Sequence, residues 1–206
     1  MMQRKHEFLL MALGLIPFIF AAATALADIN KFFLINDINL ILEKEKKVDA
    51  LISNFDLQIP LANNAQNFYK NIYEILNNNG FLCFNLLTLN SFTTLQKIFL
   101  EIDDHVFNGA QLRFGPFHNI SNIISDLNDN KFKEVVVSTE NIEVNYKSLN
   151  KLRKDFKELG ISNYYIDKSK TNKKFYKKTT SLFKELVAKH HYIPVEIEIS
   201  TFTSWK

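Results

Sequence analysis

The sequence predicts an α/β protein: an open sheet with helices on both faces and an antiparallel strand at its C-terminal end. Residues 48–52 and 81–88 are apolar runs without alternation, as in strands buried on both faces. Between them lies a segment of helix length that ends in the breaker NNNG at 77–80, the order of a strand–helix–strand crossover. The alternation of residues 195–205, VEIEISTFTSW, predicts a strand with one polar face, at an antiparallel edge or in a hairpin.

Polar side chains follow the first predicted strand. Ser53, Asn54 and Asp56 come directly after the apolar run 48–52. In open α/β sheets, ligands bind in the crevice at the carboxyl ends of the strands. We therefore expect Ser53 and Asn54 to line a ligand crevice.

Length and composition indicate one domain of ordinary size. The chain has 206 residues, 47% of them hydrophobic, which is enough to bury a core. Its net charge of +3 is too small to indicate a nucleic-acid binder. The one cysteine, Cys83, lies in a predicted strand without metal-ligand companions, so we interpret it as a small buried residue.

Residues 3–27 carry the strongest local signal. Gln3-Arg4-Lys5 is a basic start, residues 8–23 are apolar, and Ala25-Leu26-Ala27 supplies small residues, as in a secretory signal peptide. Left uncleaved, residues 8–27 are about long enough to hold the protein at a membrane with the basic end inside. The third interpretation is a degenerate first βα unit with Gly14 at its turn. We favour a signal-like or membrane segment over the fold remnant.

The chain is thus divided into residues 1–27, the signal-like segment, and residues 28–206, the α/β domain. In the first part of this domain, residues 32–35 are a short strand, Asn36-Asp37 a turn, and residues 38–47 a helix with a charged end.

The elements after residue 88 follow from caps and periodicity. A helix is expected from an N-cap at Ser91 to about residue 105, and a loop over residues 107–117. The remaining elements are a helix at 119–129, strands at 132–137 and 142–146, a helix at 148–159 closed by Gly160, and a basic segment, 168–178, that leads into a helix at 180–189.

Arg113 stands alone in the apolar segment 112–117. Such an arginine either pairs with a carboxylate of the fold or binds an anionic ligand. The run Asp-Asp-His at 103–105 invites a metal site, but neighbouring helical residues point about 100° apart, so we expect a solvated helix end. No metal site, catalytic triad or phosphate loop is predicted.

The segment from Lys147 to Lys178 is rich in lysine. It could dock an acidic protein partner such as an acyl carrier protein. The alternative is a solvated face of a lysine-rich protein.

From residue 48 onward the chain resembles the class I S-adenosylmethionine-dependent methyltransferases, whose sheet is Rossmann-like. Within them it is most similar to the group with the malonyl-ACP O-methyltransferase of biotin biosynthesis and the methyltransferase-like assembly factors of mitochondrial complex I. The resemblance rests on six motifs in order: VDALISNFDL, YEILNNNGFLCFNLL, LRFGPF, IEVNY, DFKELGISN and IPVEIEISTFTSWK.

The departures concern the cofactor half of that family. Three βα units precede the strand matched by residues 48–52, at roughly 30 residues each with the return strand, and cannot fit into the 47 preceding residues. The glycine-rich loop is absent, Asp37 is the one candidate for the cofactor ribose, and Gln58-Ile59 stands where the family has His-Trp. The resemblance implies a truncated sheet, the C-terminal part of the methyltransferase fold.

The resemblance implies two functions. In the first, the protein is an S-adenosylmethionine-dependent methyltransferase acting on a carboxylate or related acceptor, with Asp37, Ser53 and Asn54 at the cofactor and Arg113 and Tyr146 at the substrate. In the second, it is a cofactor-free assembly or scaffold protein, with or without membrane association. The family implies a cytoplasmic or inner-membrane-associated protein, whereas the N-terminal segment implies export.

Overall fold

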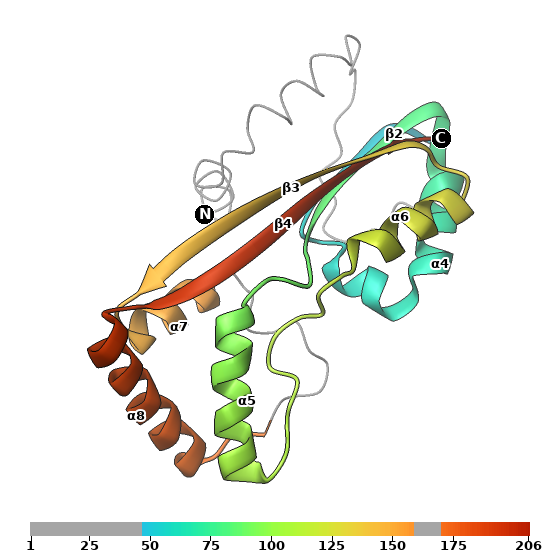
Figure 1. Cartoon of the computed structure of the whole chain (residues 1–206). Helices are drawn as coiled ribbons and strands as arrows, with labels where there is room; N and C mark the ends of the chain where they lie inside the picture. Colours follow the sequence, from blue (N-terminus) through green and yellow to red (C-terminus); the bar gives the residue numbers. More distant parts are fainter. Residues whose placement is uncertain (1–46, 159–169) are drawn as a thin grey trace. The chain divides into compact units, whose positions relative to one another are not determined.

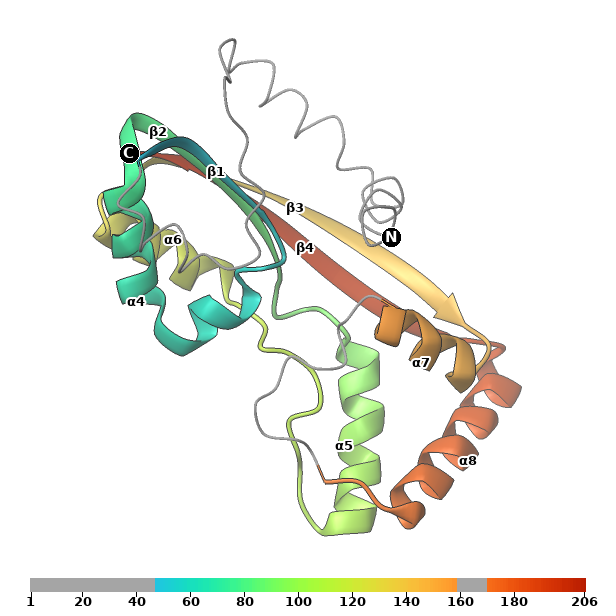
Figure 2. The ribbon, with the colours of Figure 1, turned by 180° about the vertical axis from the view of Figure 1, so that it is seen from behind.

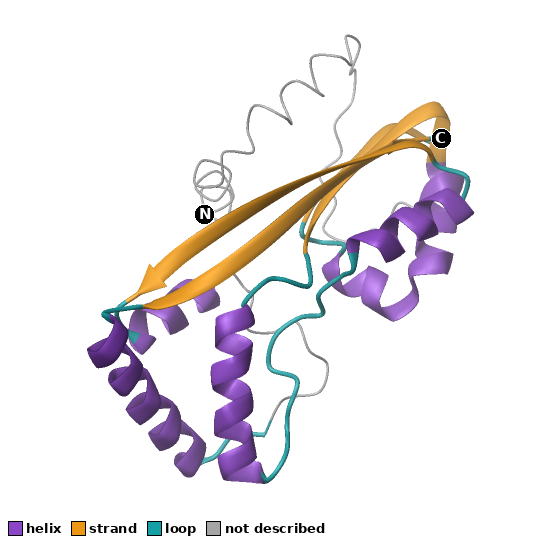
Figure 3. Ribbon diagram, in the orientation of Figure 1, coloured by secondary structure: helices purple, strands orange, loops and turns teal. Residues whose placement is uncertain are grey.

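The computed structural model describes residues 47–158 and 170–206, which fall in one compact unit. Within these residues, four strands form one sheet in the order β1-β2-β4-β3 (Figures 1 and 3). The predictions for the signal-like segment, the elements at 32–47 (all but residue 47), Asp37 and Gly160 lie outside the described residues. Among the described helices, none has the length and hydrophobicity of a membrane span.

The predicted crossover is confirmed, but the expectation that residues 48–52 are buried on both faces is wrong: in this run only Leu51 is buried and Ile52 is 47% exposed. Strand β1 (Val48–Asn54) leads into helix α4 (Gln58–Ile75) and then strand β2 (Leu76–Leu87), which pairs with β1 in parallel. Leu82, Phe84 and Leu86 of β2 are buried in the core, and the ring of Phe84 packs against Tyr69 of α4. At the breaker, Asn79 adopts a φ of 62°, and a Cβ on Gly80 would lie 2.7 Å from the Asn77 carbonyl oxygen. The turn therefore requires a glycine at position 80.

The C-terminal strand is antiparallel, as expected, but it does not lie at an edge. Strand β4 (Ile193–Trp205) is inserted between β2 and β3 (Lys133–Tyr146) and is antiparallel to both. Strand β3 covers both strands predicted at 132–137 and 142–146, because its pairing with β4 continues through residues 138–141. The polar residues of that stretch interrupt the sequence pattern without interrupting the backbone hydrogen bonds.

Helix α5 (Thr93–Phe107) follows β2, and α6 (Ile120–Asp129) precedes β3. Helices α7 (Leu149–Glu158) and α8 (Lys173–His190) separate β3 from β4. Both ribbon views place α4 to α8 on one side of the four strands (Figure 2). Helices for the opposite face would have to come from residues outside the described ranges.

Phenylalanines join α5, α7 and α8. Their rings form a chain of contacts with centroids 5.1–6.1 Å apart, which we call the phenylalanine cluster: Phe92, Phe99, Phe107, Phe114, Phe156 and Phe175. Such ring pairs contribute about 0.5–1.5 kcal/mol each beyond the area they bury. The cluster therefore gives these three helices a core of their own.

The N-caps confirm or correct three predicted helix starts. The helix predicted at 119–129 is confirmed as α6, and Asn119 is its N-cap, since its side-chain oxygen accepts hydrogen bonds from the backbone N–H groups of Ser121 and Asn122. The N-cap expected at Ser91 is wrong: α5 begins after Phe92, which has a left-handed backbone and no side-chain cap. Helix α8 starts at Lys173 rather than residue 180, because Asn172 caps it through Phe175 N–H (2.8 Å).

Candidate functional site

The carboxyl ends of β1 and β2 meet at the edge of the sheet where a ligand crevice was expected. In the parallel register, Ser53 lies beside Phe84 and Asn54 beside Asn85. The buried amide of Asn85 donates to Asn54 Oδ1 (2.8 Å) and accepts from the N–H of Phe55 (2.9 Å). The loop that leaves β1 is therefore fixed to β2 by one asparagine, which the sequence analysis did not single out.

Ser53 and Asn54 differ in how the fold uses them. Asn54 Oδ1 is already engaged by Asn85. The Oγ of Ser53 is buried and has no hydrogen-bond partner among the described residues. A buried hydroxyl without a partner costs free energy, about 1–3 kcal/mol, so it marks a place where a ligand atom would be stabilising. The cofactor roles of Ser53, Asn54 and Asp37 stay predictions.

Gln58 holds the end of β2 to the start of α4. Its side-chain amide makes the pair of hydrogen bonds that the backbone of a neighbouring strand would make. Nε2 donates to the carbonyl of Leu87 and Oε1 accepts from the N–H of Leu87, both at 2.9 Å. Nε2 also donates to the carbonyl of Pro116. At 1% exposure, this amide satisfies backbone groups that water cannot reach. The residue that replaces the family's histidine is thus part of the framework.

His118 extends this framework. Its Nε2 donates to the backbone carbonyl of Gln58 (2.7 Å), which fixes the proton on that nitrogen. Burial lowers the pKa of His118, with the hydrogen bond to Gln58 opposing the shift, so the ring is neutral near pH 7.

Two glutamates of β4 anchor the connection from β2 to α5. The buried carboxylate of Glu198 accepts from Thr88 Oγ1 and from Asn90 Nδ2 (2.8 Å). Glu196 accepts from the N–H of Thr94 (3.1 Å) and from its hydroxyl. Burial raises the pKa of each glutamate, but the hydrogen bonds outweigh it and the net pKa is lowered. Both side chains are therefore ionised and structural at neutral pH.

Ser91 belongs to the same anchor. Its hydroxyl donates to the carbonyl of Glu198 and accepts from the N–H of Glu198, both at 3.0 Å. This pairing explains why Ser91 does not cap α5: its oxygen is already used across the sheet.

Arg113 pairs with a carboxylate of the fold, the first of its two predicted alternatives. Its guanidinium donates from Nε to both oxygens of Asp103 (2.9 and 2.8 Å) and from Nη2 to the same carboxylate and to the carbonyl of Lys170 (3.0 Å). The charge also lies 3.9 Å from the ring centroid of Phe175. The expectation that residues 103–105 form a solvated helix end is wrong for Asp103, which is fully buried.

Tyr146 ends β3 and is 7% exposed. Its hydroxyl donates to Asp155 Oδ2 on α7 (3.1 Å), and burial, together with the Asp155 carboxylate, raises the pKa of Tyr146 to about 12. Asn54 is bonded to β2, Arg113 to Asp103 of α5 and to the carbonyl of Lys170, and Tyr146 to Asp155 of α7, so these three predicted site residues share no hydrogen-bond partner. The substrate roles of Arg113 and Tyr146 stay predictions.

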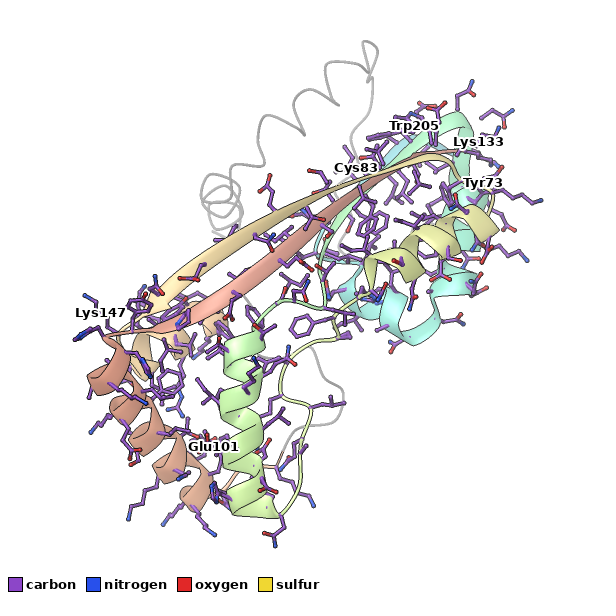
Figure 4. All side chains as sticks on the ribbon, in the orientation of Figure 1. Tyr73, Cys83, Glu101, Lys133, Lys147 and Trp205 are labelled. Carbon is purple, nitrogen blue, oxygen red and sulfur yellow. The ribbon has the colours of Figure 1, made fainter. Side chains whose placement is uncertain are left out.

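In the described part of the chain, no group of three His, Cys, Asp or Glu side chains could hold a metal ion. Cys83 is a free thiol of intermediate exposure on β2, 3.8 Å from Thr203 Oγ1 (Figure 4).

The fold and this edge define an α/β protein of the type that binds ligands at the carboxyl ends of parallel strands. A "Putative methyltransferase" of Rickettsia prowazekii is 30% identical over 162 residues, 78% of this chain and 69% of that protein. The chain therefore belongs to the class I S-adenosylmethionine-dependent methyltransferase family. No family model matches.

Two further relatives are more distant. Malonyl-[acyl-carrier protein] O-methyltransferase 1 of Coxiella burnetii is 27% identical over 61% of this chain, and a mitochondrial arginine-hydroxylase of Dictyostelium discoideum is 23% identical over 79%. The chain covers 41% and 37% of these two proteins. Among solved structures, an Archaeoglobus fulgidus S-adenosylmethionine-dependent methyltransferase is similar at a TM-score of 0.40, with 11% identity, covering 84% of this chain and 66% of that one.

Proposed function

We propose that the protein binds S-adenosylmethionine and methylates a carboxylate or a related acceptor. The observation that carries the proposal is the unpartnered Ser53 Oγ at the carboxyl end of β1, in a chain of the methyltransferase family. A cofactor hydroxyl or amino group would satisfy this oxygen, so the residue present fits the cofactor.

The bound cofactor supplies the activated methyl group. The chain's own part is to bind and align. Asn85 holds the loop after β1 in place, and Gln58 holds the start of α4, so the crevice edge is preorganised before a ligand arrives. A carboxylate acceptor is a nucleophile without a general base, which agrees with a crevice edge whose polar groups are mostly neutral amides and hydroxyls.

The named activity of the Coxiella burnetii relative supports a carboxylate acceptor, since malonyl esters are methylated on a carboxylate. The test uses the full chain with methyl-labelled S-adenosylmethionine and a malonyl thioester. A carboxylate product is a methyl ester, so the label should be released as methanol by mild base. Labelled product that resists base contradicts the acceptor class, and no label transfer from a folded chain that binds the cofactor contradicts the activity.

A specific observation also favours the second candidate, a cofactor-free assembly or scaffold role. Asn54, Gln58, Arg113 and Tyr146 all have hydrogen-bond partners inside the fold. In a protein that no longer catalyses a reaction, these hydrogen bonds would still stabilise the fold, and the described fold would act by binding another protein. The two candidates differ in cofactor binding, which the first requires and the second does not.

A partner for either role would be acidic. Exposed basic side chains lie along α7, the first turns of α8 and the residues just before each helix, listed here for the described part of residues 147–178: Lys147, Lys151, Arg153, Lys154, Lys157, Lys170, Lys173, Lys174 and Lys177. Lys151 and Lys154 pair with Asp155 and Glu158 (2.8 and 3.9 Å), which reduces the free charge. Figure 4 places Lys147 at the opposite end of β3 from Lys133. We propose that this surface steers an acidic carrier protein, with binding that weakens as salt rises.

The proposed location is the cytoplasm or the cytoplasmic side of the inner membrane, where S-adenosylmethionine is present.

A further inference from the structure

A cleft of about 430 Å³ lies between α4 and α6, beside the connection that follows β2. Figures 1 and 2 both show these two helices side by side. A cleft of this volume is in the range that small-molecule sites occupy. Its walls are the apolar side chains of Leu61, Ala65, Leu89, Phe117 and Ile123 and the polar side chains of Tyr69, His118, Asn119, Asn122 and Asp126.

One wall of the cleft carries a hydroxyl with nothing to bond. Tyr69 is fully buried, and its Oη has no hydrogen-bond partner among the described residues. The ring itself packs against Phe84 with centroids 6.3 Å apart, so the side chain is held in place. Leaving a buried hydroxyl unpaired is costly in free energy, and a ligand atom in the cleft would remove that cost.

The cleft has one charged side chain at neutral pH, the carboxylate of Asp126. Gln66 donates to Asp126 Oδ1 (2.7 Å), and no described residue donates to the second oxygen. Burial raises the pKa of Asp126, against the hydrogen bond from Gln66 and with the help of Asp129. Burial also raises the pKa of Tyr69, and Asp126 adds to that shift. Asp126 and Tyr69 both line this cleft, so a ligand bound in it meets both side chains.

Gln66 also fixes the distance between the two helices. Its Oε1 accepts from Asn130 Nδ2 (3.0 Å) while its Nε2 binds Asp126, so α4 and α6 are joined at the rim of the cleft. The carboxylate is therefore held in position before a ligand arrives, which lowers the entropy cost of binding.

We propose that this cleft binds a small organic ammonium ion, with its charge at Asp126 and Tyr69 Oη and its hydrocarbon part against Leu61, Leu89 and Phe117. A cation is favoured because a carboxylate is the one charge in the cleft, and an anion would be repelled by it. An ammonium group donates hydrogen bonds, which suits a carboxylate and a hydroxyl that both accept. The site stands independently of the proposed methyltransferase function.

The test measures binding of 2-phenylethylammonium to the full chain by calorimetry, with amide chemical-shift changes locating the site. Two probes of similar shape act as controls: neutral 2-phenylethanol and anionic phenylacetate. We expect 2-phenylethylammonium to bind about tenfold or more tightly than 2-phenylethanol, because only the ammonium makes a charge-assisted hydrogen bond. Phenylacetate should not bind.

Three variants test the residues. Asp126→Asn should weaken ammonium binding by about tenfold or more, whereas Asp129→Asn, an exposed carboxylate of the same helix, should change it less than about twofold. Tyr69→Phe should weaken binding by roughly two- to tenfold without lowering the melting temperature, because the hydroxyl has no partner to lose.

Equal binding of ammonium and alcohol, or of the ammonium to wild type and Asp126→Asn, would overturn the proposal. So would the absence of ammonium binding to a folded chain, or shifts located away from α4 and α6.

Discussion

Replacing Asp103 with asparagine removes the carboxylate that neutralises Arg113 between α5 and α8. The side chains of this pair are 8% and 1% exposed, so the guanidinium left behind would be buried without a counter-charge. Breaking a buried pair from one side costs about 3–5 kcal/mol. The charge would keep its contact with the ring of Phe175, which is worth about 1–2 kcal/mol when desolvated, so we expect a net loss near the lower end, about 3 kcal/mol.

Urea unfolding of Asp103→Asn, followed by circular dichroism, measures this loss. The double variant Asp103→Leu/Arg113→Met removes both charges and keeps similar volume, so it should be more stable than the single variant by about 2 kcal/mol or more. Asp104→Asn, an exposed carboxylate one residue along, serves as the control and should change stability by less than about 0.5 kcal/mol. A single variant that costs less than about 1 kcal/mol, or a double variant as unstable as the single, would refute a structural role for this pair.

Three further predictions concern the framework. In Glu198→Gln the melting temperature should fall less steeply between pH 7 and pH 3 than in the wild type. The pKa of Glu198 in the folded protein is below its ordinary value of 4.5, so the wild-type carboxylate contributes stability above pH 4.5. That stability is lost as the pH falls through the folded pKa. Gln58→Met should cost about 2–4 kcal/mol in urea unfolding, because both backbone groups of Leu87 lose their partner; a cost under about 1 kcal/mol would contradict the pairing. Tyr146→Phe should cost about 0.5–1.5 kcal/mol through the lost bond to Asp155, and should remove an ultraviolet titration with a midpoint near pH 12.

The sequence was sufficient for the parts of the fold that depend on local pattern. Unalternating apolar runs predicted the parallel pair β1 and β2, and the helix predicted at 119–129 is α6. Both features depend on residues near one another in the chain, where propensity and capping decide the outcome.

Two of the errors came from interactions between distant residues. Ser91 has the right type and place for an N-cap, but its hydroxyl bonds to Glu198, 107 residues away. The polar face of β4 suggested an edge strand exposed to solvent. The strand lies inside the sheet, and the polar side chains of Glu196 and Glu198 accept hydrogen bonds from the connection after β2 instead of from water.

The site was predictable in location and less so in detail. Placing Ser53 and Asn54 at the carboxyl end of β1 required only the crossover. Asn85, Gln58 and His118 could not be assigned, because a polar residue in or beside an apolar run gives no sign of which backbone groups it will reach. The one available signal is that Gln58 stands at the start of α4 in place of the family's histidine, and this substitution does not reveal which backbone groups the amide reaches.

Calorimetric titration of the full chain with S-adenosylmethionine tests the central claim most directly. The methyltransferase account predicts binding with roughly micromolar to submillimolar affinity. Ser53→Ala should weaken it by about two- to tenfold, whereas Ser181→Ala on the exposed face of α8 should leave it unchanged. A folded chain that binds no S-adenosylmethionine would contradict the account and would leave the assembly or scaffold role as the function to test.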